Sequence, residues 1–197
     1  MSEPSDTPAA RAPLVTRPKR MDALATLPVF FKLKGKRVLL AGGSEPALWK
    51  AELMSAAGAR VDVYADDAVD EFRELAADPP GGPVVIHARA WAQDDFGDAV
   101  LAIGALADDA AAEAFRLAAR KAGVPVNVID RPEFCAFQFG AIVNRSPLVV
   151  AISTDGGAPV FAQAIRSRLE ALLPLGFKRW AEARCASTAS VKSRRVF

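Results

Sequence analysis

The chain has 197 residues, of which 51% are hydrophobic and 24% are charged. This balance is typical of a folded globular protein and excludes the disordered and fibrous classes. The 25 Lys and Arg nearly cancel the 23 Asp and Glu, and a formal charge of +2 does not favour a nucleic-acid partner. Charged residues interrupt every apolar run that could span a bilayer. We therefore expect a cytoplasmic protein with no nucleic-acid or membrane partner.

Composition divides the chain into four parts. Residues 1–26, rich in Ser, Pro, Ala and Arg, are expected to be a disordered leader without the apolar stretch of a secretory signal. Residues 27–136 are expected to form the main domain, and 137–174 a smaller unit after it. Hydrophobic periodicity fades after Pro174, so 175–197 is expected to be a frayed tail.

The main domain alternates short apolar strands with helices. Such alternation predicts a parallel sheet that is covered by helices, the Rossmann-like α/β arrangement. Its strands are expected at 37–41, 61–64, 84–87, 100–104 and 126–130, and its helices at 47–57, 66–77 and 108–122.

The pattern changes after Asp130. Two strands are expected at 137–143 and 148–153, joined by a turn at 144–147, and a helix is expected at 159–173. These elements indicate a small α+β addition to the sheet domain rather than a continuation of it.

A glycine-rich turn follows the first expected strand. Its residues Gly42, Gly43 and Ser44 lie between a strand and a helix, where a Rossmann domain binds the pyrophosphate of a dinucleotide. The motif is degenerate, and an ordinary tight turn is the alternative. An acidic residue near the end of the second strand would hold a ribose, or would be only a surface carboxylate or a helix cap; the candidates are Asp62, Asp66 and Asp67.

Asp130 follows the last strand of the expected sheet, at the edge where such sheets place their sites. A carboxylate there would serve as a general base, or would be a turn residue before Pro132. Asp108 and Asp109 follow the preceding strand and are expected to cap a helix. The single histidine, His87, excludes His-rich metal sites, and we expect no metal centre.

Six ordered blocks resemble the precorrin-2 dehydrogenase module of siroheme synthases between about Leu27 and Pro174. They are Leu27 to Leu33 (LPVFFKL), Gly42-Gly43, Lys50 to Leu53 (KAEL) with Ala57-Gly58-Ala59, Asn127 to Asp130 (NVID), Asn144 to Leu148 (NRSPL) and Leu172-Leu173-Pro174. The resemblance implies NAD-dependent oxidation of precorrin-2 to sirohydrochlorin. In many members the same site then inserts ferrous iron, so iron would be a further substrate.

The resemblance also assigns residues. Asp130, in the NVxD motif, is the catalytic acid–base, and 137–174 is a region through which the chain forms a homodimer. The cofactor-binding positions are Gly42, Gly43, Ser44, Glu45, Pro46, Asp66 and Asp67. Candidate partners for the tetrapyrrole are Asn127, Arg145, Arg166 and Arg168, although the last two are also consistent with a solvated helix face. A dimer that binds NAD or a tetrapyrrole without turnover is the alternative function.

Overall fold

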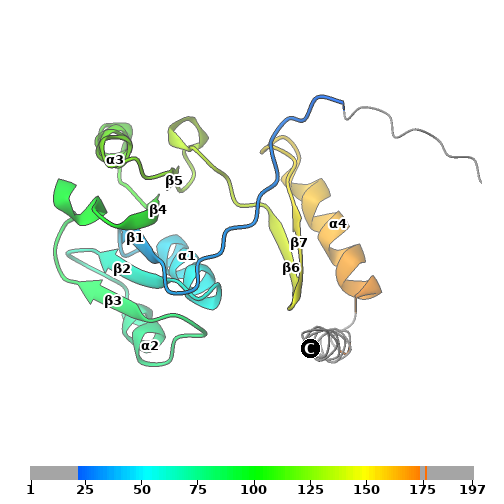
Figure 1. The fold of residues 1–197 in the computed structure, drawn as a ribbon, viewed down its shortest axis with the longest axis horizontal. Coiled ribbons are helices and arrows are strands. Elements are labelled where there is room, and N and C mark those ends of the chain that lie inside the picture. Colours follow the sequence, from blue (N-terminus) through cyan, green and yellow to red (C-terminus); the bar gives the residue numbers. More distant parts are fainter. Residues whose placement is uncertain (1–21, 174–175, 177–197) are drawn as a thin grey trace, which may run out of the picture.

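The computed structural model describes residues 22–173 and 176. Its larger part is a five-stranded parallel sheet in the order β3-β2-β1-β4-β5 (Figure 1). The strands are β1 (Arg37–Ala41), β2 (Arg60–Tyr64), β3 (Val84–His87), β4 (Ala99–Gly104) and β5 (Val126–Val128). This order reverses direction between β1 and β4, and it confirms the expected Rossmann-like class.

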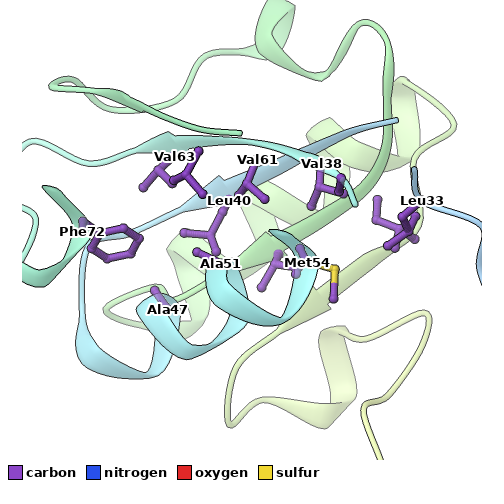
Figure 2. Close-up of a cluster of buried hydrophobic side chains, with 13 residues drawn as sticks. Leu33, Val38, Leu40, Ala47, Ala51, Met54, Val61, Val63 and Phe72 are labelled. Carbon is purple, nitrogen blue, oxygen red and sulfur yellow. The ribbon is translucent and has the colours of Figure 1, made fainter. Parts of the chain in front are cut away.

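One face of the sheet packs against helices α1 (Glu45–Ala56) and α2 (Glu71–Ala77). Figure 2 shows the strand residues Val38, Leu40, Val61 and Val63 facing apolar helix residues; those helix residues are Ala47, Ala51, Met54 and Phe72. Small residues on α1 allow the helix to approach the strands closely. The core therefore fixes the start of α1 directly after β1.

The opposite face is covered by α3 (Asp109–Lys121) and by a short 3-10 helix at Gln93–Phe96. Phe96 and Phe115 are fully buried there, and Trp91 packs against both rings. No helix or strand was expected at 88–98, because this stretch has no helical or strand periodicity. In the structure, residues 88–98 connect β3 to β4 and cover this face of the sheet in place of a long crossover helix.

The second unit is an antiparallel pair of strands with one helix. β6 (Ala141–Arg145) pairs with β7 (Leu148–Ile152), and α4 (Pro159–Leu172) packs on β6. Figure 1 shows this unit beside the sheet, on the side where α1 lies. The expected small α+β unit is confirmed as a fold.

Several expected boundaries were wrong, and three differences bear on the site. α2 begins at Glu71 rather than Asp66, because 65–70 forms a loop in which the Val69 amide donates to the Gly43 carbonyl at 3.0 Å. β5 ends at Val128, two residues before Asp130. β6 begins at Ala141 rather than at residue 137. Before it, Phe137 and Phe139 pack their rings against each other and against the core between the sheet and helices α1 and α2.

Several expectations concern residues outside the described ranges. These are residues 1–21 of the leader and, in the tail, residue 175 and residues 177–197. Within the described residues, no helix is long and apolar enough to cross a membrane.

Candidate functional site at the carboxyl edge of the sheet

The sites predicted from the sequence meet at the carboxyl ends of the parallel strands. Gly42 follows β1, Asp66 follows β2, Ala105 follows β4 and Asp130 follows β5. β1 and β4 are neighbours whose connections leave in opposite directions, and ligands of open α/β sheets bind at this point. The topology therefore gives all four loops one common edge.

The glycine loop is held tightly between its neighbours. Gly42 has a φ of +100°, and a Cβ at this residue would lie 2.3 Å from the Ala105 carbonyl oxygen. A Cβ at Gly43 would lie 2.4 Å from the Asp67 carbonyl oxygen. Both positions require glycine because the backbone of an adjacent loop occupies the space of a side chain.

The first turn of α1 leaves backbone donors without a side-chain cap. Ser44 is the N-cap residue, but its hydroxyl makes no capping hydrogen bond, and Pro46 lies in the first turn. Uncapped N–H groups at a helix N-terminus attract anions, and Ser44 itself is exposed. The exposed carboxylates of Asp66 and Asp67 lie in the next loop along the edge. This donor and acceptor set fits the pyrophosphate and a ribose of a dinucleotide.

Asp62, the third candidate for a ribose contact, has another role. Its side chain is 3% exposed and pairs with Arg37 and with Arg60, whose Nε lies 3.0 Å from Oδ1. Although burial raises the pKa of Asp62, hydrogen bonds from both arginines lower it below its usual value. Asp62 therefore joins β1 to β2 beneath the surface, away from the carboxyl edge.

Neither Asp66 nor Asp67 caps α2, since this helix begins only at Glu71. Asp108 does cap α3: its carboxylate accepts a hydrogen bond from the Ala111 amide at 2.8 Å, as expected. His87 ends the edge strand β3 and stacks on Tyr64 with ring centroids 4.5 Å apart. Its Nε2 is buried and has no hydrogen-bond partner among the described residues.

Asp130 is exposed and has a φ of +60°, a left-handed conformation that non-glycine residues rarely adopt. The neighbouring Arg131 forms an ion pair with Asp109 and donates to the Ala107 carbonyl at 3.1 Å. These contacts tie the loop after β5 to the loop after β4. Strained backbone that is held in this way is concentrated at functional sites.

Asn127 is buried in β5 and holds the chain that follows. Its Nδ2 donates to the Phe137 carbonyl at 2.9 Å and approaches the Cys135 sulfur at 3.4 Å. Burial raises the pKa of the Cys135 thiol, which also donates to backbone carbonyls of Val128 and Arg131. Asn127 therefore sets the direction in which the chain leaves the sheet.

A cleft of about 450 Å³ lies between the sheet domain and the second unit. Its lining comes from α1, the segment before β6, the loop between β7 and α4, and α4 itself. The polar and aromatic side chains of the lining include Trp49, Lys50, Phe139, Thr154, Gln163 and Arg166. Trp49, Lys50 and Phe139 were not among the site residues expected from the sequence. The KAEL block contains Lys50, but nothing in its pattern indicates that another unit packs opposite it.

The three arginines predicted to bind substrate are in different places. Arg166 lines the cleft and pairs with Glu170 at 3.1 Å. Arg168 is exposed and is not among the lining residues. Arg145 donates to the carbonyls of Leu173 and Glu170 at the end of α4, outside the lining. The structure thus brings only Arg166 to the cleft.

Comparisons with known proteins agree with this architecture. The family model NAD_binding_7, which describes NAD(P)-binding domains, matches residues 29–141. Siroheme synthase of Stutzerimonas stutzeri is 42% identical over 178 residues, covering 87% of this chain and 38% of the relative. Siroheme synthase of Azotobacter vinelandii is 43% identical over the same length, again covering 87% of this chain and 38% of the relative.

A solved structure, "SirC, precorrin-2 dehydrogenase", shares the fold with a TM-score of 0.61 and 22% identity, covering 80% of this chain and 76% of the other. The chain spans only 38% of the length of the two siroheme synthases. The family match covers more than half of the chain, from the segment before β1 to the start of β6. The chain therefore belongs to this family of NAD(P)-binding domains.

Proposed function

We propose that the protein oxidises precorrin-2 to sirohydrochlorin with NAD as the acceptor. The observation that carries the proposal is Asp130, an exposed carboxylate in a constrained left-handed turn on the same sheet edge as the glycine loop. The siroheme synthase relatives and the fold shared with a precorrin-2 dehydrogenase support this reaction. Tetrapyrrole substrate would enter the adjoining cleft.

Each part of the edge has a role in the proposal. The amides of Gly43, Ser44 and Glu45 bind the pyrophosphate, and Asp66 or Asp67 accepts hydrogen bonds from a ribose. Gly42, whose amide donates to the Tyr64 carbonyl at 2.9 Å, and Pro46, which has no N–H, contact the cofactor without donating to it. NAD supplies the chemistry of hydride acceptance. Asp130 takes the proton that the macrocycle must also lose, and Asn127 fixes the chain leading from the catalytic loop to the cleft.

Charged side chains of the cleft would meet the carboxylates of the substrate. Arg166 is the arginine that lies in the lining, and we assign it this contact. Arg145 and Arg168 would bind substrate only if the ligand or a second subunit extends beyond the cleft. Their contribution is therefore expected to be smaller.

Ferrous iron would be a second substrate of the same site. Metal insertion needs a group that accepts pyrrole protons, and Asp130 could accept them without NAD. Among the described residues, no group of three or more His, Cys, Asp and Glu side chains is placed to hold a metal ion. Iron would therefore be received by the macrocycle itself.

The proposal includes a homodimer formed through residues 137–174. Several large apolar side chains of this region are exposed in the single chain: Val149, Val160, Phe161 and Leu172, with Phe161 61% exposed. Apolar surface of this kind typically marks an interface.

The direct test mixes purified protein with NAD and precorrin-2. The proposal predicts that NADH absorbance and the bands of sirohydrochlorin rise together, and that both depend on NAD. If NAD binds but no spectral change follows, the proposed dehydrogenase activity is contradicted. That result would favour a non-catalytic binding module.

A further inference from the structure

Two adjacent residues of α1, Trp49 and Lys50, line the cleft on the side of the sheet domain. Trp49 lines the cleft and is 52% exposed, so about half of its surface is open to a ligand. The Lys50 ammonium lies 3.9 Å from the centroid of the Phe139 ring and 4.5 Å from that of Trp49. Figure 1 shows α1 on the side of the sheet domain that faces β6.

The charge in this cleft is unbalanced. Lys50 and Arg166 are both in the lining, which contains no acidic side chain among the described residues. Arg166 has Glu170 as its partner, whereas Lys50 forms no ion pair within the described part of the chain. Burying an ammonium without a carboxylate is unfavourable unless a ligand supplies one.

The pKa of Lys50 reflects this environment. Burial lowers it to about 8, and the negative charge of Asp130 only partly opposes the shift. An anion that enters the cleft would stabilise the charged ammonium and raise its pKa again. The groups around Lys50 also suit a flat ligand, because an exposed indole offers a stacking surface and Thr154 and Gln163 offer hydrogen bonds.

We propose that Trp49 and Lys50 form the substrate-recognition wall of the cleft, with the indole stacked on a conjugated macrocycle and the ammonium paired with one of its peripheral carboxylates. This inference rests on the proposed function for the identity of the natural ligand. It assigns specificity to a helix whose first turn is expected to bind the cofactor. One helix would therefore contact both reactants.

Binding is tested first without NAD or turnover. The probe is uroporphyrin, a stable porphyrin with acetate and propionate side chains, and its Soret band reports binding to the full chain. We expect Lys50→Gln to weaken binding about ten-fold, the loss of one charge-assisted contact, and Lys50→Arg to restore most of it. Trp49→Ala is expected to weaken binding several-fold.

Two controls make the result specific. Lys121→Gln removes an exposed cation on α3, far along the chain from the cleft lining, and should leave binding unchanged. Lys50→Met keeps an apolar side chain against Phe139 while removing the charge. It replaces Lys50→Gln in the assay if Lys50→Gln unfolds at a lower temperature than the wild type. The same variants are then assayed with precorrin-2, where KM should rise by the same factor and kcat should change little.

The outcomes separate the two proposals. If the wild type oxidises precorrin-2 and loss of the Lys50 charge leaves both the uroporphyrin affinity and KM unchanged, the recognition wall is refuted and the function stands. If the wild type binds uroporphyrin in a Lys50-dependent way but never forms NADH, the function is refuted and the wall stands. Absence of porphyrin binding by the wild type would overturn the wall directly.

Discussion

At the scale of single residues, the buried carboxylate of Asp62 organises the start of the sheet. It accepts from arginines on both β1 and β2, while Arg37 also donates to Tyr64 Oη at 3.1 Å and to the Asp95 carbonyl at 2.7 Å. Arg37 is itself largely buried. Charges of this kind are tolerated because each has a partner, so the group behaves as a unit.

Asp62→Asn should lower the free energy of unfolding by about 3 kcal/mol, because it leaves a largely buried guanidinium without its main counter-charge. Urea denaturation measures this change. Asp98→Asn is the matched control, since Asp98 pairs with the same Arg37 but is 81% exposed, and its loss should cost at most about 1 kcal/mol. Equal losses from the two variants would refute the organising role of Asp62.

Acid should remove the same stabilisation. The pKa of Asp62 is lower in the folded chain than its ordinary value, so the stabilisation is complete above the unfolded pKa of about 4 and is lost as pH falls through the folded pKa. Hydrogen bonds from Arg89 lower the pKa of Asp95 to about 2, and this carboxylate acts in the same direction. The stability difference between the wild type and Asp62→Asn should therefore shrink below about pH 4. A difference that stays constant to pH 2 would contradict this linkage.

At the scale of elements, the junction of β1 and α1 decides where the cofactor lies. The packing of Gly43 against Asp67 means that a side chain there disturbs the fold as well as the cofactor site. Substitution of Ser44 avoids this problem, because Ser44 is exposed and its hydroxyl makes no capping bond. It therefore offers a cleaner test of cofactor binding.

Ser44→Asp and Ser44→Asn should both be tolerated, since Asp and Asn are equally good N-cap residues. The added carboxylate of Ser44→Asp would repel the pyrophosphate, so NAD affinity should fall about ten-fold or more, whereas Ser44→Asn should retain it within about three-fold. Calorimetric titration with NAD distinguishes the two. Equal affinities would show that the pyrophosphate does not approach this turn.

The sequence predicted the elements that carry the site better than the contacts within it. Alternating apolar strands and helices located the glycine loop and Asp130 on one edge, because parallel strands end together. It did not predict that Asp62 is buried, since a carboxylate within a strand shows no partner until the pairing of β1 with β2 brings the Arg37 side chain within reach of it. Nor did it show Trp49 and Lys50 as cleft residues, because the opposite wall comes from elements beyond residue 137.

At the scale of the whole molecule, the exposed apolar face of the second unit bears on assembly. Phe161 lies in the first turn of α4 and is 61% exposed, and Val160 beside it is 83% exposed. Surface of this type is costly in water but stabilising between subunits. We therefore expect this face to lie in the homodimer interface.

Phe161→Asp should raise the dissociation constant of the dimer by at least about thirty-fold, because it places a charge at the centre of an apolar contact. Light scattering over a dilution series measures the change. Leu117→Asp on α3, where the leucine is 50% exposed, is the matched control and should leave the dimer intact. A wild type that stays monomeric at micromolar concentration would exclude the assembly.

The role of Asp130 is the central claim, and Asp130→Asn is the variant that tests it most directly. Asn tolerates the left-handed backbone that Asp130 adopts, so the fold and the affinity for NAD should be preserved, as calorimetry with NAD would confirm. NADH formation from precorrin-2 should then fall by roughly 10² or more, the usual effect of losing a general base. Full activity of Asp130→Asn would contradict the assignment, and Asp108 and Asp109 on the same edge would become the next candidates.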